Sequence, residues 1–142
     1  MPSGRPHLLR ASLLLLAALL WVGAGAPPAA AHGILERSDP AANASLDAPP
    51  RQVVLWFNEP VDATFSSATV ADAQGRRVSR DAALSADRRV LQVPVGDLSS
   101  GLYTVRWRVL SAVDGHTTSG AFVFAVGQTV PTGLGGSEPA PP

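Results

Sequence analysis

The sequence predicts an all-β domain, built as a sandwich or a Greek-key barrel of about seven short strands. Three observations support this prediction. β-Branched and aromatic runs recur along the chain, turn-forming residues separate them at intervals of about 8 to 15 residues, and no stretch keeps a helical periodicity. Such a succession of short strands is typical of two-layer β architectures.

Five segments carry a strand pattern: 52–58, 67–73, 89–95, 101–112 and 117–126. The clearest is 101–112, where apolar residues at odd positions from 103 alternate with polar residues between them. This alternation predicts a half-buried antiparallel strand with Tyr103 and Trp107 in the core. Trp56 falls on the opposite face to Phe57, so it either covers the second side of a sheet or lies near a surface site. Residues 32–50 are rich in Pro, Asn, Asp and Ser, which are turn and extended-chain signals.

The first 31 residues read as a signal peptide, with a basic start, an apolar run over 8–22 and an Ala-Ala-Ala site at 29–31. Cleavage between Ala31 and His32 is expected to export the protein to the periplasm or the cell exterior. Residues 32–127 then form one domain and residues 128–142 a flexible tail rich in Gly and Pro. No later segment has 18 consecutive apolar residues, so the mature chain is not expected to span a membrane.

The composition limits which partners the protein can bind and which atoms can act as metal ligands. Removing Arg5 and Arg10 with the signal leaves 9 basic and 11 acidic residues, a net charge of −2, which makes nucleic acid an improbable partner. The chain has no Cys, and its one methionine, Met1, leaves with the signal. Any metal site must therefore use nitrogen and oxygen ligands, and no methionine site for Cu(I) is expected.

Two features point to a metal. Cleavage would make His32 the N-terminus, and its free α-amine and imidazole could then chelate one ion, a pairing that suits Cu(II). Asp114-Gly115-His116, at the turn between the last two predicted strands, places a carboxylate and an imidazole where both can point to one side. Each feature alone has a plain explanation, since any residue can follow a cleavage site and Asp-Gly is a common turn.

Together with the strand pattern, these features resemble the CopC family of copper resistance proteins. The residues that carry the resemblance are His32 and the segments Ser-Asp-Pro at 38–40, Phe-Asn-Glu-Pro at 57–60, Tyr-Thr-Val-Arg-Trp at 103–107, Val-Asp-Gly-His at 113–116 and Gly-Ala-Phe at 120–122. The resemblance covers nearly all of the mature chain.

The resemblance implies an immunoglobulin-like Greek-key fold that binds one Cu(II) ion per chain. It implies His32, Asp114 and His116 as the metal ligands, with Glu59 behind them and hydrogen-bonded toward the terminal amine. It also suggests a link with a CopD-type membrane copper protein.

The leading hypothesis is therefore an exported, non-catalytic protein that sequesters or delivers Cu(II). One alternative is a copper oxidase or mono-oxygenase that uses a terminal-histidine brace, although Asp114 would crowd the open position such an enzyme needs. Another is an immunoglobulin-like interaction module without metal. Zn(II) would fit the same ligands, but Cu(II) should win by the usual order of affinities.

Overall fold

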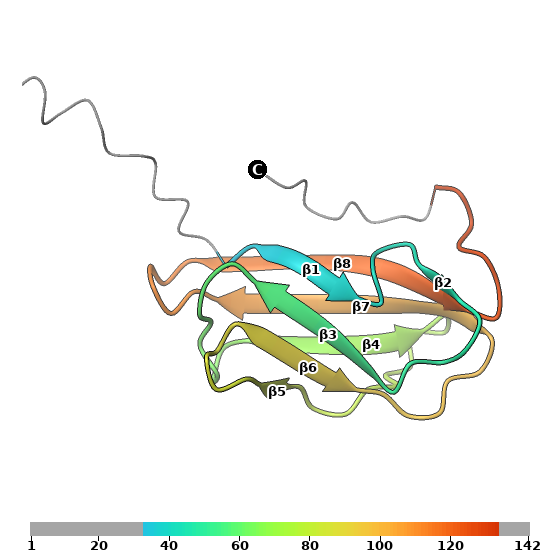
Figure 1. The fold of residues 1–142 in the computed structure, drawn as a ribbon, viewed down its shortest axis with the longest axis horizontal. Coiled ribbons are helices and arrows are strands. Elements are labelled where there is room, and N and C mark those ends of the chain that lie inside the picture. Colours follow the sequence, from blue (N-terminus) through green and yellow to red (C-terminus); the bar gives the residue numbers. More distant parts are fainter. Residues whose placement is uncertain (1–32, 134–142) are drawn as a thin grey trace, which may run out of the picture. The chain divides into compact units, whose positions relative to one another are not determined.

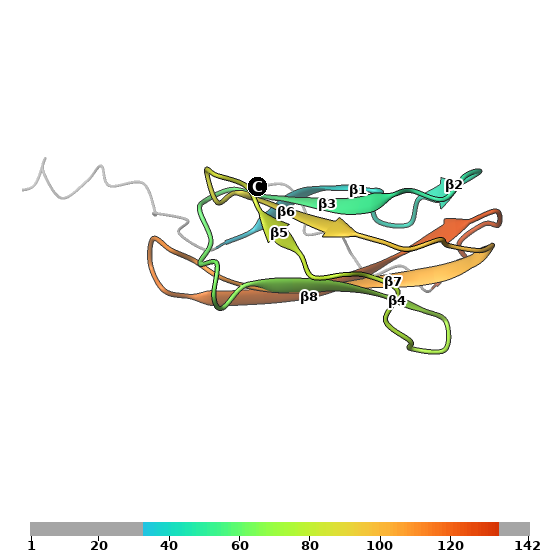
Figure 2. The same ribbon diagram turned by 90° about the horizontal axis from the view of Figure 1, so that it is seen from below.

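The computed structural model describes residues 33–133, which fold into two stacked β-sheets (Figure 1). The strands are β1 (Leu35–Asp39), β2 (Ser45–Leu46), β3 (Gln52–Phe57), β4 (Ser67–Asp72), β5 (Ala83–Leu84), β6 (Val90–Pro94), β7 (Gly101–Leu110) and β8 (Thr117–Val126). One sheet has the order β1-β3-β6-β5 and the other β2-β8-β7-β4. Figure 2 shows the two layers edge-on. The predicted all-β sandwich is confirmed.

The chain repeatedly changes sheet, so that sheet neighbours such as β3 and β6 are distant in sequence. The longest ladder joins β7 and β8, which pair antiparallel from Gly101 opposite Val126 to Leu110 opposite Thr117. Both strands are ten residues long, and they correspond to the predicted segments 101–112 and 117–126.

Three of the strands, β1, β2 and β5, were not among the segments predicted as strands, although about seven strands were expected in all. β2 and β5 have two residues each, too few to show a period of two. β1 lies in the region expected to hold turns and extended chain, and it carries Glu36, Arg37 and Asp39. It is an edge strand with a register shift between Leu35 and Arg37, and charge and bulges are common at sheet edges.

The core fills the space between the sheets. Tyr103 and Trp107 are both buried, as predicted. The Phe57 and Trp107 rings meet edge to face with centroids 5.5 Å apart, and Tyr103 stacks on Phe124 at 5.4 Å. Fully burying a large apolar side chain contributes about 1.5–3 kcal/mol, so these side chains hold the two layers together.

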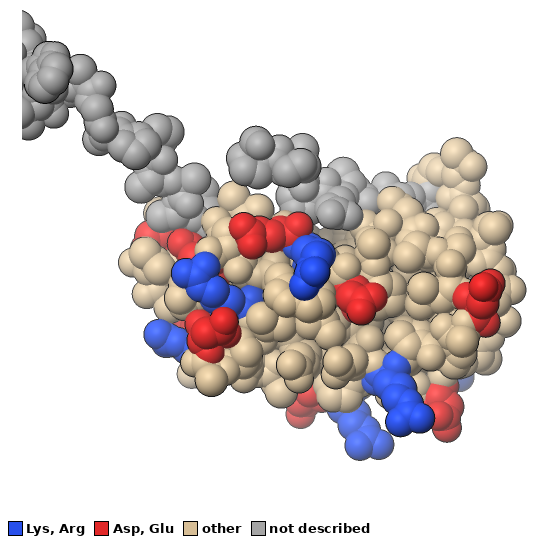
Figure 3. Space-filling view, viewed as in Figure 1, with Lys and Arg blue, Asp and Glu red and all other residues tan. Residues whose placement is uncertain are grey.

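Trp56 lies on the outer side of its sheet, where the guanidinium carbon of Arg37 sits 3.8 Å from the centre of its ring. Trp56 thus covers the outer side of this sheet, one of the two positions predicted for it. The face of the molecule in Figure 3 carries basic and acidic side chains interspersed, without a large area of one sign.

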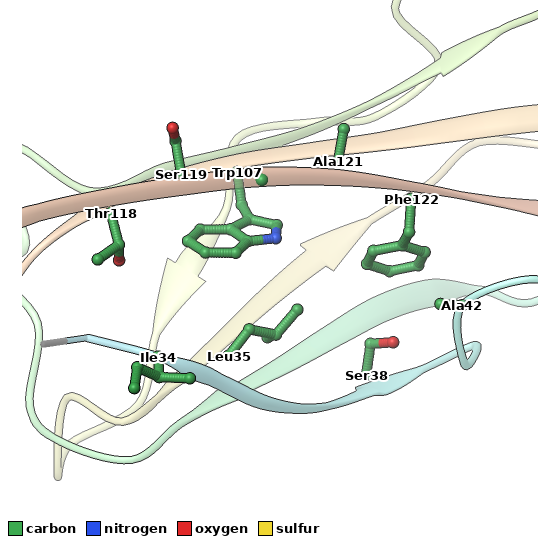
Figure 4. Close-up of a pocket in the computed structure, with 10 residues that line it drawn as sticks. Ile34, Leu35, Ser38, Ala42, Trp107, Thr118, Ser119, Ala121 and Phe122 are labelled. Atoms are coloured by element: carbon green, nitrogen blue, oxygen red, sulfur yellow. The ribbon is translucent and has the colours of Figure 1, made fainter. Parts of the chain in front are cut away.

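A cavity of about 250 Å³ opens between β1 and β8, where the two sheets are not hydrogen-bonded to each other. Figure 4 shows Trp107 and Phe122 pointing into it from one sheet and Leu35 from the other. Gly120 forms part of its wall, and a Cβ there would lie 2.7 Å from Cζ2 of Trp107. The indole therefore packs where only a glycine leaves room.

Across the described range, no helix is long and apolar enough to cross a membrane.

Candidate metal site

Asp114 and His116 lie in the turn from β7 to β8, at the end of the sandwich where β1 begins (Figure 1). Ser111 organises this turn. Its hydroxyl oxygen accepts hydrogen bonds from the backbone N–H groups of Val113 and Asp114, at 3.0 and 3.1 Å, and its own N–H donates to the His116 carbonyl at 2.8 Å. Gly115 has φ 74°, a conformation that glycine adopts without strain.

The turn brings the two predicted ligands into direct contact. Nδ1 of His116 lies 2.8 Å from Oδ2 of Asp114, and the His116 N–H donates to Oδ1 of the same carboxylate at 2.9 Å. The Asp114 side chain is 17% exposed and that of His116 is 65% exposed. The geometry therefore pairs a shielded carboxylate with an accessible imidazole.

The hydrogen bond from the His116 backbone holds the pKa of Asp114 well below its usual range, against the opposing effect of partial burial. Hydrogen bonds from the His116 imidazole and the Ser111 hydroxyl lower the pKa further. The carboxylate is therefore anionic at any physiological pH. An anionic oxygen beside an imidazole is a donor pair that suits a divalent transition metal.

Glu59 is buried at the same end of the sandwich, two residues after the end of β3. The following residues bind the β7–β8 turn, because Pro60 accepts a hydrogen bond from the Ala112 N–H at 2.9 Å and Val61 bridges to Ser111. Within the described residues, Oε1 of Glu59 accepts no hydrogen bond. Burying a carboxylate oxygen without a hydrogen-bond donor is costly, and this oxygen can accept a hydrogen bond from a donor outside the described residues.

His32 lies outside the described residues, which begin at its neighbour Gly33. Gly33 is buried, and its carbonyl accepts a hydrogen bond from Oγ1 of Thr118, two residues beyond His116. Ile34 is held by Asn58, which accepts from its N–H at 2.8 Å and donates its own N–H to the Ile34 carbonyl at 3.0 Å. Gly33 is thus tied to the strand that follows His116, and Ile34 is tied to the segment that follows β3.

The structure brings Asp114 and His116 together. Within residues 33–133, no group of three or more His, Cys, Asp or Glu side chains could hold a metal ion. Glu59 does not join the pair. The sequence did not predict the roles of Ser111 and Thr118. Ser111 holds the turn through its hydroxyl, and Thr118 holds Gly33 through a hydrogen bond. No local sequence motif indicates either contact.

Comparison with known proteins places the chain in a family. The CopC domain matches residues 35–127. Protein YobA of Escherichia coli K12 is 37% identical over 118 residues, which cover 81% of this chain and 94% of YobA. The copper transport protein CutJ of Bacillus subtilis is 33% identical over 101 residues, which cover 69% of this chain but 18% of CutJ.

Two solved structures share the fold. CopC from Methylosinus trichosporium OB3b superposes with a TM-score of 0.63 at 34% identity, covering 67% of this chain and 93% of that protein. PcoC, a methionine-rich copper resistance protein from Escherichia coli, gives 0.60 at 29% identity, covering 68% and 99%. The chain therefore belongs to the CopC family of copper resistance and transport proteins, which bind copper and are not enzymes.

Proposed function

We propose that this protein is exported, binds one Cu(II) ion at its mature N-terminus, and sequesters or delivers that ion outside the cytoplasm. The observation that carries the proposal is the contact between Asp114 and His116, together with the hydrogen bond that ties the buried Gly33 to Thr118, two residues beyond His116. A covalent neighbour lies about 3.8 Å away from Cα to Cα, so anchoring Gly33 keeps His32 near that end of the sandwich.

The proposed ligands are the α-amine and imidazole of His32, the imidazole of His116 and the carboxylate of Asp114. This set of three nitrogens and one oxygen suits the tetragonal geometry that Cu(II) prefers. Glu59 is proposed to accept a hydrogen bond from the terminal amine. Its buried oxygen, which has no donor within the described residues, supports this role.

The oxidation state follows from the ligands that the mature chain offers. PcoC is described as methionine-rich, whereas residues 32–142 contain neither Met nor Cys. Soft sulfur ligands select Cu(I), so a site of nitrogen and oxygen atoms is proposed to hold Cu(II).

The copper is proposed to pass to or from a membrane copper protein of the CopD type. CutJ supports this idea, because the matched region is a small part of a much longer copper transport protein. We also propose that the signal peptide directs export to the periplasm or the cell exterior and is then cleaved between Ala31 and His32.

A Cu(II) titration of the mature protein tests this function. The chain that starts at His32 is expected to bind one equivalent. Starting the chain at Ala31 converts the His32 amine into an amide, and Asp114→Ala removes the carboxylate, so both changes should weaken binding strongly. Asp97→Asn is a matched control, because Asp97 is an exposed carboxylate in the β6–β7 loop, away from the turn. Equal affinity in all four proteins would refute the proposed site.

A further inference from the structure

Thr118 is the first inward-facing residue of β8. Figure 4 shows its hydroxyl pointing from β8 toward the β1 side, while the neighbouring Ser119 points the opposite way. Its Oγ1 donates a hydrogen bond to the carbonyl of Gly33, 85 residues away in the sequence. The contact ties the start of the first strand of one sheet to the start of the last strand of the other.

Gly33 is closely surrounded by side chains. A Cβ at this position would lie 3.2 Å from Cγ2 of Val109, 3.6 Å from Cγ1 of Val61 and 3.7 Å from Oγ1 of Thr118. The Gly33 backbone is therefore walled by three side chains. A buried carbonyl needs a hydrogen-bond donor, and the Thr118 hydroxyl supplies one.

The same strand begins one residue after His116, so the Thr118 hydroxyl joins the peptide after His32 to the strand after His116. Without this hydrogen bond, Asn58 would still hold Ile34, but Gly33 would lose its anchor on β8. A loose Gly33 would leave the terminal residue free to sample positions far from the Asp114–His116 pair.

We infer that Thr118 is a positioning residue for the proposed N-terminal chelate: its hydroxyl holds Gly33, the residue that follows His32, on the strand that follows Asp114 and His116. This inference rests on the proposed function. Ordering one residue on binding costs about 1–2 kcal/mol, and a pre-ordered terminus avoids that cost.

Replacing Thr118 by Val keeps the side-chain shape and removes the donor. The Kd for Cu(II) should rise about five- to thirtyfold, which is the equivalent of that 1–2 kcal/mol. Thr118→Ala removes the same donor without the bulk and should act in the same direction, so the test does not depend on one variant. Thr118→Ser keeps the hydroxyl and should restore binding to within about twofold of the unsubstituted protein.

Thr117→Val is the matched control. It makes the same exchange one residue closer to His116, yet within residues 33–133 the Thr117 hydroxyl makes no hydrogen bond, and its side chain is exposed. Its Kd should stay within about twofold of the unsubstituted protein. Circular dichroism and melting temperature, measured without metal, confirm that each variant is folded.

A double-mutant cycle separates positioning from a general effect on the fold. In a chain that starts at Ala31 and also carries His32→Ala, both His32 nitrogens are already lost as ligands, so Thr118→Val should change the remaining affinity by less than about twofold. An equal loss in both chains, or no loss in the chain that starts at His32, would overturn this inference alone. Failure of the unsubstituted mature protein to bind Cu(II) would overturn it together with the proposed function.

Discussion

Nδ1 of His116 lies 2.8 Å from Oδ2 of Asp114, across a turn in which Gly115 is the only intervening residue. The contact orients the imidazole, and it adds to the hydrogen bond from the His116 backbone, which is the main cause of the lowered pKa of Asp114. A turn without a binding role needs only the hydrogen bond from the His116 N–H to Oδ1 of Asp114. The additional contact between the imidazole ring and Oδ2 is what couples the two side chains. Four predictions follow from this arrangement and from the packing around it.

Asp114→Asn keeps the size of the side chain and removes its charge. The Cu(II) Kd is expected to rise by more than the roughly 10- to 100-fold typical of losing a partner outside the ligand set, because here a proposed anionic ligand is lost. Competition titration against a chelator of known affinity measures the change. An Asp114→Asn protein that binds Cu(II) as tightly as the parent would exclude the carboxylate from the site.

Copper affinity is expected to fall as the pH is lowered from 8 to 5. A free α-amine titrates near pH 8 and an unperturbed imidazole near pH 6.5, and both must lose protons to bind copper. The pKa of Asp114 is lowered, so its carboxylate is already ionised throughout this range and adds no proton of its own.

The dependence of log Kd on pH, measured in steps of half a pH unit, should therefore flatten above pH 8 and show no extra proton uptake from Asp114 near pH 4 to 5. Affinity that is constant from pH 8 to 5 would contradict nitrogen ligation at this site.

The ionised carboxylate of Asp72 is expected to stabilise the fold, and this contribution should be lost in acid. Partial burial opposes ionisation, but hydrogen bonds from the Arg76 backbone and side chain and from the Gln74 N–H outweigh it and lower the pKa. A carboxylate with a lower pKa in the folded state stabilises the fold above its unfolded pKa, near 3.9. That stability is lost as the pH falls through the folded pKa.

Asp72→Asn should thus lower the melting temperature at pH 7 and close the gap to the parent protein as the pH approaches 3. Asp47→Asn, at an exposed carboxylate, serves as the comparison. A gap that is unchanged between pH 7 and pH 3 would show that the charge of Asp72 does not matter.

Gly120→Ala tests the packing of Trp107. The added Cβ would lie 2.7 Å from Cζ2 of the indole, so the ring must shift, and overpacking of this kind typically costs about 1–3 kcal/mol. The free energy of unfolding by urea should drop by that amount and the Trp fluorescence maximum should move. Ser119→Ala, on the exposed face of the same strand, should leave both unchanged.

The sequence was sufficient for the features that depend on short-range pattern. The alternation in β7 located that strand and its buried face, the strand pattern over 117–126 located β8, and the Asp114–His116 contact spans only one residue. The two-residue strands β2 and β5 left no period to detect, and β1 is an edge strand rich in charge.

The anchoring of Gly33 by Thr118 could not be predicted, because it depends on a contact between residues 85 positions apart. A threonine at an inward position of a strand looks, in sequence, like any other β-branched residue. The burial of Glu59 likewise depends on how the segment after β3 docks on the β7–β8 turn, which only the fold determines.

The most direct test of a copper site created by export is the intact mass of the secreted protein, measured under native conditions with and without Cu(II). We expect a chain that begins at His32 and gains the mass of one copper ion. A mature chain that begins at another residue and still gains one copper ion, or a chain that begins at His32 and gains none, would rule out a site created by cleavage before His32.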